Sequence, residues 1–139
     1  MYKFDIFTDS SCDLNQDMID QYDLKVMQLE VTIDDAEPVL NNEINVKDFY
    51  DQLRAGSMAK TNAVPLGQFE DNMRKSLDAG KDILYLGFSS GLSATYANGV
   101  MVMEDIKDDY ADRKLIHYDT LSASMAQGLI VYYAALLRE

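Results

Sequence analysis

Small hydroxyl side chains are concentrated in three short stretches of this sequence, each directly after an apolar, strand-like run. The stretches are T-D-S-S at 8–11, S-S-G-L-S at 89–93 and D-T-L-S-A-S at 119–124. A helix-like segment follows each of them, and the first backbone N–H groups of a helix are unpaired and partly positive. One Ser or Thr at such a turn is ordinary helix capping. Three such turns sharing one edge of a sheet predict a site for an anion.

The residue types of these turns narrow the kind of anion. Phosphate sites usually contain Lys or Arg, and none of the three turns has either; Lys60, beside Thr61, is the nearest candidate. The glycine-rich patterns that bind nucleotide phosphates are absent as well. Neutral hydroxyls and backbone N–H groups suit a singly charged group, so the sequence predicts a carboxylate ligand.

The same residues give little support for a metal site. Asp9, Asp13 and Asp119 follow strand ends and could converge, but their spacing matches no ligand motif. His117 is the single histidine, which argues against zinc. We therefore expect neither a metal nor another cofactor.

Hydrolysis is an alternative function, because G-F-S-S-G at 87–91 matches the G-x-S-x-G pattern of serine hydrolases. Ser89 would be the nucleophile and His117 its base, with Asp119 on the same side of the strand as His117. In such hydrolases the acid precedes the histidine in the chain. The acids between Ser89 and His117 would lie at the far end of a helix; they are Asp105, Asp108, Asp109 and Asp112. Carboxylate binding is favoured, and the hydrolase remains the alternative.

Alternating strand-like and helix-like segments are expected to position these turns. Strands are predicted at 3–8, 25–33, 82–88 and 114–118, and helices at 14–23, 46–55, 66–79, 94–106 and 125–139. Asn15 and Asn45 are the expected N-caps, Gly56 and Gly80 the C-terminal stops, and 56–65 is expected to be a loop. This alternation predicts an α/β fold, a mostly parallel sheet with helices on both faces.

The composition limits the class of protein. With 139 residues, 47% of them hydrophobic and 26% charged, the chain is expected to form one globular domain. Its net charge of −12 would repel nucleic acids and anionic membrane surfaces. Cys12 is the single cysteine, so no disulfide can form within the chain, and a reducing, cytoplasmic setting is expected. The N-terminal residues are expected to form a strand directly, with no signal segment, and no apolar run approaches the roughly 18 residues of a membrane span.

The hydroxyl-bearing turns resemble those of the DegV family of fatty-acid-binding proteins, also called FakB. The stretches T-D-S-S-C-D-L at 8–14, S-S-G-L-S-A-T-Y at 89–96 and S-A-S-M-A-Q-G-L at 122–129 are similar to the family's T-D-S-S-A-D-L, S-S-G-L-S-G-T-Y and S-A-S-M-G-Q-G-L. Thr61 stands where the family's T-S-Q-P segment begins. The order and spacing agree along the whole chain.

The resemblance implies a lipid carrier that is not itself an enzyme. Members hold a long-chain fatty acid in a tunnel and present its carboxylate to a separate fatty acid kinase, which makes the acyl phosphate for phospholipid synthesis. Carried over, Thr61 and Ser93 would hydrogen-bond the carboxylate, and the backbone around Asn62 and Ala94 would assist. Ser89, Ser90 and Gly91 would shape the turn.

The sequence departs from the family's pattern at three points. T-N-A-V-P replaces T-S-Q-P-S at 61–65, which leaves the role of Asn62 open. Ala94 stands where the family has glycine, which alters how closely a ligand approaches. The resemblance makes residues 1–139 the N-terminal α/β domain. In the family, a second domain follows and supplies part of the tunnel, a histidine other than His117 and the basic residues that face the kinase; that domain is absent from these residues.

Overall fold

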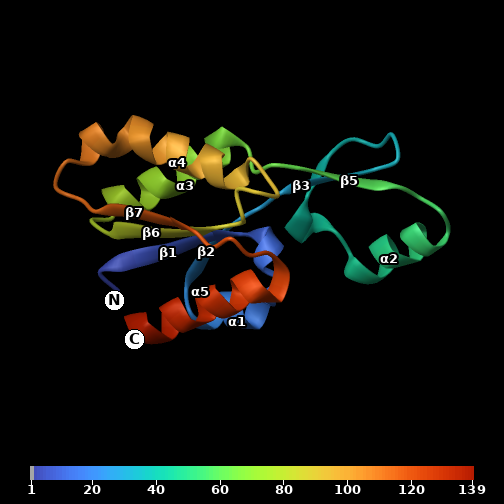
Figure 1. Cartoon of the computed structure of the whole chain (residues 1–139), viewed down its shortest axis with the longest axis horizontal. Helices are drawn as coiled ribbons and strands as arrows, with labels where there is room; N and C mark the ends of the chain where they lie inside the picture. The colour runs from blue at the N-terminus through green and yellow to red at the C-terminus, as the bar shows by residue number, and fades with distance from the viewer. Residues whose placement is uncertain (1) are drawn as a thin grey trace.

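A computed structural model describes residues 2–139 of the chain. Its centre is a four-stranded parallel sheet with the strand order β2-β1-β6-β7 (Figure 1). The strands are β1 (Phe4–Asp9), β2 (Leu24–Met27), β6 (Asp82–Gly87) and β7 (Leu115–Asp119). The expected α/β class with a mostly parallel sheet is therefore confirmed.

Helices cover both faces of this sheet (Figure 1). They are α3 (Leu66–Asp78) and α4 (Thr95–Ile106) on one face, and α1 (Gln16–Gln21) and α5 (Ser124–Arg138) on the other. Side chains alternate between the faces along each strand. Phe7 and Tyr85 pack with Phe69 of α3, whereas Ile6 packs with Val131 of α5. Fully burying such a side chain stabilises the fold by about 1.5–3 kcal/mol.

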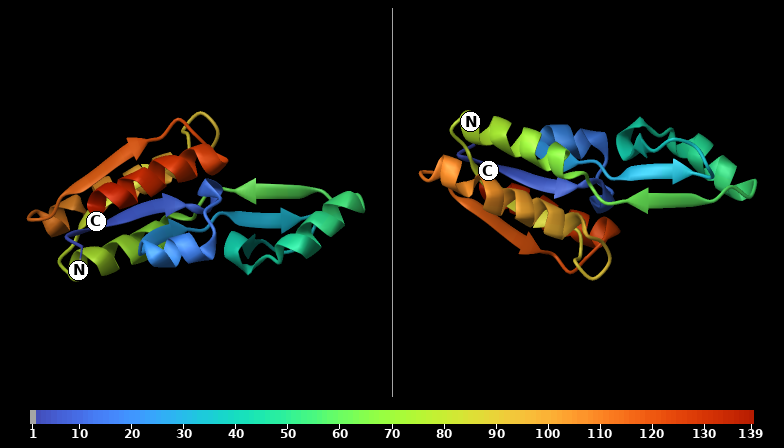
Figure 2. Two further views of the ribbon diagram at one scale, coloured as in Figure 1. Left: turned by 90° about the horizontal axis from the view of Figure 1, so that it is seen from below. Right: turned by 90° about the horizontal axis from the view of Figure 1, so that it is seen from above.

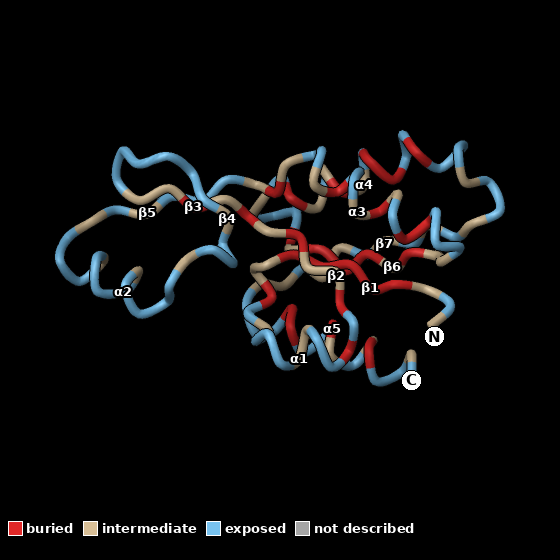
Figure 3. Tube along the Cα trace, turned by 180° about the vertical axis from the view of Figure 1, so that it is seen from behind, coloured by how far each residue is buried: buried red, intermediate tan, exposed pale blue. Residues whose placement is uncertain are grey.

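We call the parallel sheet and the helices that cover it the body. Residues 30–62 extend away from it, and we call this segment the excursion. It contains β3 (Glu30–Ile33), β4 (Val39–Leu40), α2 (Val46–Arg54) and β5 (Ala59–Asn62). The three strands form an antiparallel sheet in the order β4-β3-β5. Figure 2 shows the excursion extending from the body, and most of it is exposed or half-buried in Figure 3. Helix α2 contains no buried residue.

The structure divides the strand predicted at 25–33 into β2 and β3, which belong to different sheets. The parallel ladder stops at the pair of Asp9 and Met27, where β1 ends, and side chains take the next two N–H groups of the chain. The N–H of Gln28 donates to Gln68 Oε1, and the N–H of Leu29 donates to Ser10 Oγ at 3.0 Å. Alternation continues through the break, since Leu29 and Val31 are both buried.

The prediction of a loop at 56–65 was wrong in part, because β5 lies within these residues and pairs antiparallel with β3. The sequence A-K-T-N contains one β-branched residue and no apolar alternation. Its strand conformation comes from the partner, which lies about thirty residues away along the chain, as the pairing of Val31 with Thr61 shows. Such pairing leaves little local signal.

The expected helix ends are largely confirmed. Asn15 accepts a hydrogen bond from Met18 N at 2.9 Å and Asn45 one from Asp48 N at 3.1 Å, so both cap their helices. Gly56 and Gly80 have φ of +106° and +79°, the left-handed region that favours glycine.

The first hydroxyl turn leads into a short 3₁₀ segment instead of an α-helix. The 3₁₀ segments are η1 (Ser10–Cys12), η2 (Asn41–Glu43) and η3 (Lys107–Tyr110). Among residues 2–139, no helix has the length and apolar character that crossing a bilayer requires.

Candidate functional site

The three hydroxyl turns meet at one edge of the parallel sheet, on the side from which the excursion extends (Figure 2). Adjacent parallel strands place their C-terminal ends together, and ligands of open sheets bind at that edge. Hydrogen bonds also join the turns directly. Phe88 N donates to Asp9 Oδ2 at 2.9 Å, Ser89 N to Ser122 O at 3.0 Å, and Thr120 Oγ1 to Gly87 O at 2.8 Å.

Ser93 lies in the turn between β6 and α4 and is half-buried. Its hydroxyl is 2.9 Å from Thr95 Oγ1 and accepts the Thr95 N–H at 3.1 Å. Its own N–H donates to Ser89 O at 3.2 Å, which closes the turn. Ala94 is the exposed N-cap of α4 and provides no side-chain cap. The position of the Ser93 hydroxyl is therefore determined by the body.

Thr61 is exposed on β5, opposite Val31. Three residues later the chain is attached to the body through the buried Val64. Its N–H donates to Thr95 Oγ1 at 3.3 Å, and its carbonyl accepts from Asn98 Nδ2 at 3.0 Å. We call this pair of hydrogen bonds the Val64 anchor. It brings the Thr61 segment to the start of α4, although no hydrogen bond joins the Thr61 and Ser93 hydroxyls themselves within residues 2–139.

The other predicted residues have varied surroundings. Asn62 is exposed and lies opposite Glu30 on β3. Ser90 N donates to the Asp119 carboxylate at 3.2 and 3.3 Å, and Gly91 N donates to Ser89 Oγ at 3.3 Å. Hydrogen bonds from Ser90 and from a neighbouring backbone N–H hold the pKa of Asp119 below its usual range. The N–H groups of Ser90 and Gly91 therefore already have partners within the protein.

A buried polar cluster under this edge was missed by the sequence interpretation. Asp9 and Gln127 are fully buried, and Gln127 Nε2 donates to Thr8 Oγ1 at 3.1 Å and to Asp9 Oδ1 at 3.2 Å. Burial raises the pKa of Asp9, despite the hydrogen bonds that it accepts. The T-D-S-S turn was recognised from its hydroxyls, but the partner on α5 carries no local signal.

The alternative hydrolase requires Ser89 beside His117, and the structure gives each a different partner. Ser89 is 8% exposed and its hydroxyl accepts from Gly91 N. His117 Nδ1 is 2.7 Å from the Tyr96 hydroxyl. Within residues 2–139 no hydrogen bond joins Ser89 to His117, so the geometry provides no base for a serine nucleophile.

The carboxylates considered for a metal also have separate partners. Asp13 Oδ2 accepts from Ser124 Oγ at 2.5 Å, whereas Asp9 and Asp119 accept from the turn after β6. In the described part of the chain, no three His, Cys, Asp or Glu side chains are grouped to hold a metal ion.

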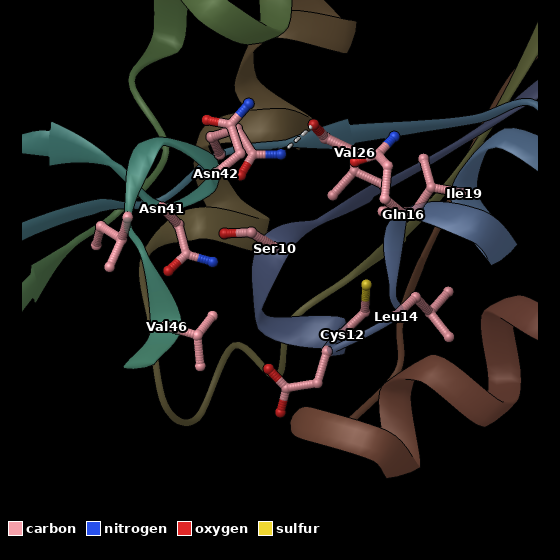
Figure 4. Close-up of a pocket in the computed structure, with 12 residues that line it drawn as sticks. Ser10, Cys12, Leu14, Gln16, Ile19, Val26, Asn41, Asn42 and Val46 are labelled. Carbon is pink, nitrogen blue, oxygen red and sulfur yellow. Dashed lines mark hydrogen bonds between the residues drawn. The ribbon is translucent and has the colours of Figure 1, made fainter. Parts of the chain in front are cut away.

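An open pocket of about 360 Å³ lies beside the first hydroxyl turn (Figure 4). It is formed by η1, the start of α1 and the segment 41–46, and its lining includes Ser10, Cys12, Gln16 and Asn41. Burial raises the pKa of the Cys12 thiol to about 11, so this group is a poor nucleophile. Thr61 and Ser93 do not line this pocket.

Comparison with known proteins places the chain in a family. Residues 3–139 match the family model described as "Uncharacterised protein, DegV family". The chain belongs to the DegV family. This DegV chain is 38% identical over 141 residues to the DegV domain-containing protein CPE0026 of Clostridium perfringens. The matched region covers 100% of this chain and 48% of that protein. It spans about half the length of the curated relatives it matches.

Two solved structures resemble this DegV chain closely. A stearic-acid-binding protein from Eubacterium ventriosum superposes with a TM-score of 0.89 at 20% identity, covering 99% of this chain and 47% of that one. At this identity the likeness shows the fold alone. TM841 from Thermotoga maritima, a protein whose structure reveals a fatty acid binding function, superposes with a TM-score of 0.83 at 28% identity, covering 99% of this chain and 49% of that one.

Proposed function

We propose that this DegV chain holds the carboxylate of a long-chain fatty acid between the hydroxyls of Thr61 and Ser93. The observation that carries the proposal is the Val64 anchor, which attaches the Thr61 segment to the helix that follows Ser93. The fatty acid binding function of the TM841 structure supports the same ligand class. Asn62, Ser90, Gly91 and Ala94 would shape the site around the two hydroxyls.

The surroundings suit a singly charged headgroup with an apolar tail. Leu92 and Leu121 are 69% and 76% exposed and lie in the same turns as the hydroxyls. Leu121 also has φ of +50°, a costly conformation for a bulky residue, and such strain is common at ligand sites. Each buried methylene contributes about 0.8 kcal/mol, whereas a hydrogen bond to a charged group contributes about 1.5–3 kcal/mol. The tail would supply most of the affinity and the hydroxyls would orient the carboxylate.

We further propose that residues 1–139 act as the N-terminal domain of a two-domain carrier. Helix α5 supports this, because a helix that is apolar all round is normally buried. Its inner face packs on the sheet through Val131, yet Tyr133 and Leu137 on its outer side are 56% and 89% exposed. A second domain covering this face would complete the lipid tunnel. The carrier would then present the carboxylate to a fatty acid kinase, and this chain would perform no catalysis itself.

Lipid extraction and titration test the proposed ligand. Mass spectrometry of an organic extract of the purified chain should detect a bound fatty acid. Removing one hydroxyl by Ser93→Ala or Thr61→Val should weaken fatty acid binding roughly 10- to 100-fold, the equivalent of one charge-assisted hydrogen bond. Thr32→Val on the neighbouring strand β3 is the matched control and should bind as the wild type does.

The same preparation tests the alternative hydrolase. A fluorophosphonate should leave Ser89 unlabelled in the wild type. Labelling that disappears in Ser89→Ala would overturn the carrier proposal in favour of hydrolysis. A chain that carries no lipid and shows neither heat nor a thermal shift on titration with fatty acids would contradict lipid binding by these residues.

A further inference from the structure

The Asp9 carboxyl is the centre of a buried hydrogen-bond cluster that joins three elements. Oδ2 accepts the Phe88 N–H at 2.9 Å, from the turn after β6. Oδ1 accepts from Gln127 Nε2 of α5 at 3.2 Å and contacts the hydroxyl and N–H of Ser11 in η1. Ser11 Oγ also lies 2.7 Å from Gln127 Oε1. Asp9 and Gln127 are inaccessible to solvent.

Counting hydrogens in this cluster gives the protonation state of Asp9. The amide oxygen of Gln127 has no hydrogen, so the single hydroxyl hydrogen of Ser11 must point to it. The contact between Ser11 Oγ and Asp9 Oδ1 then has no hydrogen, unless Asp9 supplies one. An ionised carboxylate would therefore face an oxygen lone pair at this contact, and a neutral acid would donate to it.

Exchanging the oxygen and nitrogen of the Gln127 amide does not remove the need for this proton. The amide oxygen would then lie 3.2 Å from Asp9 Oδ1 and the nitrogen would donate to Ser11. Ser11 would donate to Asp9, but the amide oxygen and the carboxylate oxygen would now face each other without a hydrogen. In either orientation of the Gln127 amide, every contact in the hydrogen-bond cluster has a hydrogen only when Asp9 is protonated.

We propose that Asp9 is a positioning residue that acts as a neutral carboxylic acid, holding the turn after β6 against α5 and η1. Loss of its proton would leave an unpaired buried charge and loosen the turn that carries Ser93. If this edge binds a carboxylate, which rests on the proposed function, a neutral Asp9 also avoids placing a negative charge beneath the ligand.

Burial and the lack of a cationic partner among the described residues favour the neutral form of Asp9, and they oppose the hydrogen bonds from Ser11, Phe88 and Gln127, which favour the ionised form. Burial is the largest influence on its pKa and raises it. Cys12 of η1 and Tyr85 of β6 also have raised pKa values and are uncharged at neutral pH, and Gln127 of α5 has no charge. Asp13 and Asp119, on the adjoining turns, are acidic, and within residues 2–139 no Lys or Arg forms an ion pair with Asp9.

An NMR titration of the labelled chain without fatty acid tests the proposal on two neighbouring amides. Phe88 N–H reports Asp9, and Ser90 N–H reports Asp119, whose pKa is lowered. The Asp9 carboxyl carbon and the Phe88 amide should share one midpoint, above the value of about 3.9 for an aspartate in an unfolded chain. The Ser90 amide should instead follow Asp119, below that value. An Asp9 midpoint at or below the unfolded value would overturn the proposal.

The Asp9→Asn variant provides a second readout, because asparagine keeps the acceptor for Phe88 and a donor for Ser11 without a charge. A raised pKa contributes stability that is complete below the unfolded value of about 3.9 and is lost as pH rises through the folded pKa. The stability of the wild type relative to Asp9→Asn should therefore fall with rising pH across that window. A flat or rising difference would contradict the proposal. If Asp9→Asn fails to fold, the wild-type titration alone decides. Neither measurement uses fatty acid, so failed lipid binding leaves this test intact.

Discussion

Helices α3 and α2 both have an apolar stripe, but only α3 buries it. Phe69, Met73 and Leu77 of α3 are in the buried cluster over the sheet. In α2, Val46 and Tyr50 are 66% and 51% exposed. The body therefore has a core of its own, whereas the excursion relies on its strand pairing and on the Val64 anchor.

This difference divides the proposed ligand site. Ser93 is held by the hydrogen bonds of a turn that lies on the core. Thr61 is on the excursion, where few apolar side chains are buried and local opening costs less free energy. The two hydroxyls should therefore respond differently to changes in the body and in the excursion.

The largest effect is expected from a matched pair of phenylalanine truncations. Phe69→Ala on α3 removes a fully buried ring and should lower the free energy of unfolding by about 3–5 kcal/mol. Phe49→Ala on α2 removes a half-buried ring and should cost about 1 kcal/mol or less. Urea unfolding curves measure both. Equal losses would show that the excursion has a core comparable to that of the body.

A matched pair of glycine substitutions tests how closely α5 approaches the first hydroxyl turn. A Cβ on Gly128 would lie 2.5 Å from the backbone oxygen of Cys12, so Gly128→Ala must push α5 and η1 apart. We expect a loss of about 1–3 kcal/mol in the free energy of unfolding. Gly67→Ala on α3 meets nothing within 4 Å and should stabilise the helix by about 0.5–1 kcal/mol. Thermal unfolding that raises the midpoint of both variants would contradict the close approach.

The smallest effect is expected from weakening the Val64 anchor. Thr95→Val deletes the hydroxyl that accepts from Val64 N and contacts Ser93, while the bond from Asn98 to the Val64 carbonyl remains. We expect a loss of about 1 kcal/mol, as for a typical hydrogen bond. The expected readout is local. Hydrogen exchange of the β5 amides should accelerate while that of the β1 amides stays unchanged. Thr32→Val, on the excursion but away from the anchor, is the control. Equal acceleration in both variants would mean that the anchor does not hold the excursion.

The sequence was sufficient to predict the parallel sheet and the edge at which its hydroxyl turns meet. Buried apolar runs such as 82–88 mark strands with both faces covered, and parallel strands must end at a common edge. The caps at Asn15 and Asn45 were predictable for a similar reason, since each bonds to an amide three residues away. These features depend on residues that are close together in the chain.

Only the tertiary structure determined how distant residues combine. β5 became a strand because β3 was available to pair with it, and Gln127 reached Asp9 across 118 residues. The hydrogen-bond partner of His117 is Tyr96 and not Ser89. The spacing of these three residues in the sequence does not predict that choice of partner. Strand pairing, the burial of a carboxyl and the partner of a histidine all depend on which surfaces come together. The sequence determined which side chains were available at the edge of the sheet, and tertiary packing determined which of them are buried, which are paired and which remain exposed to a ligand.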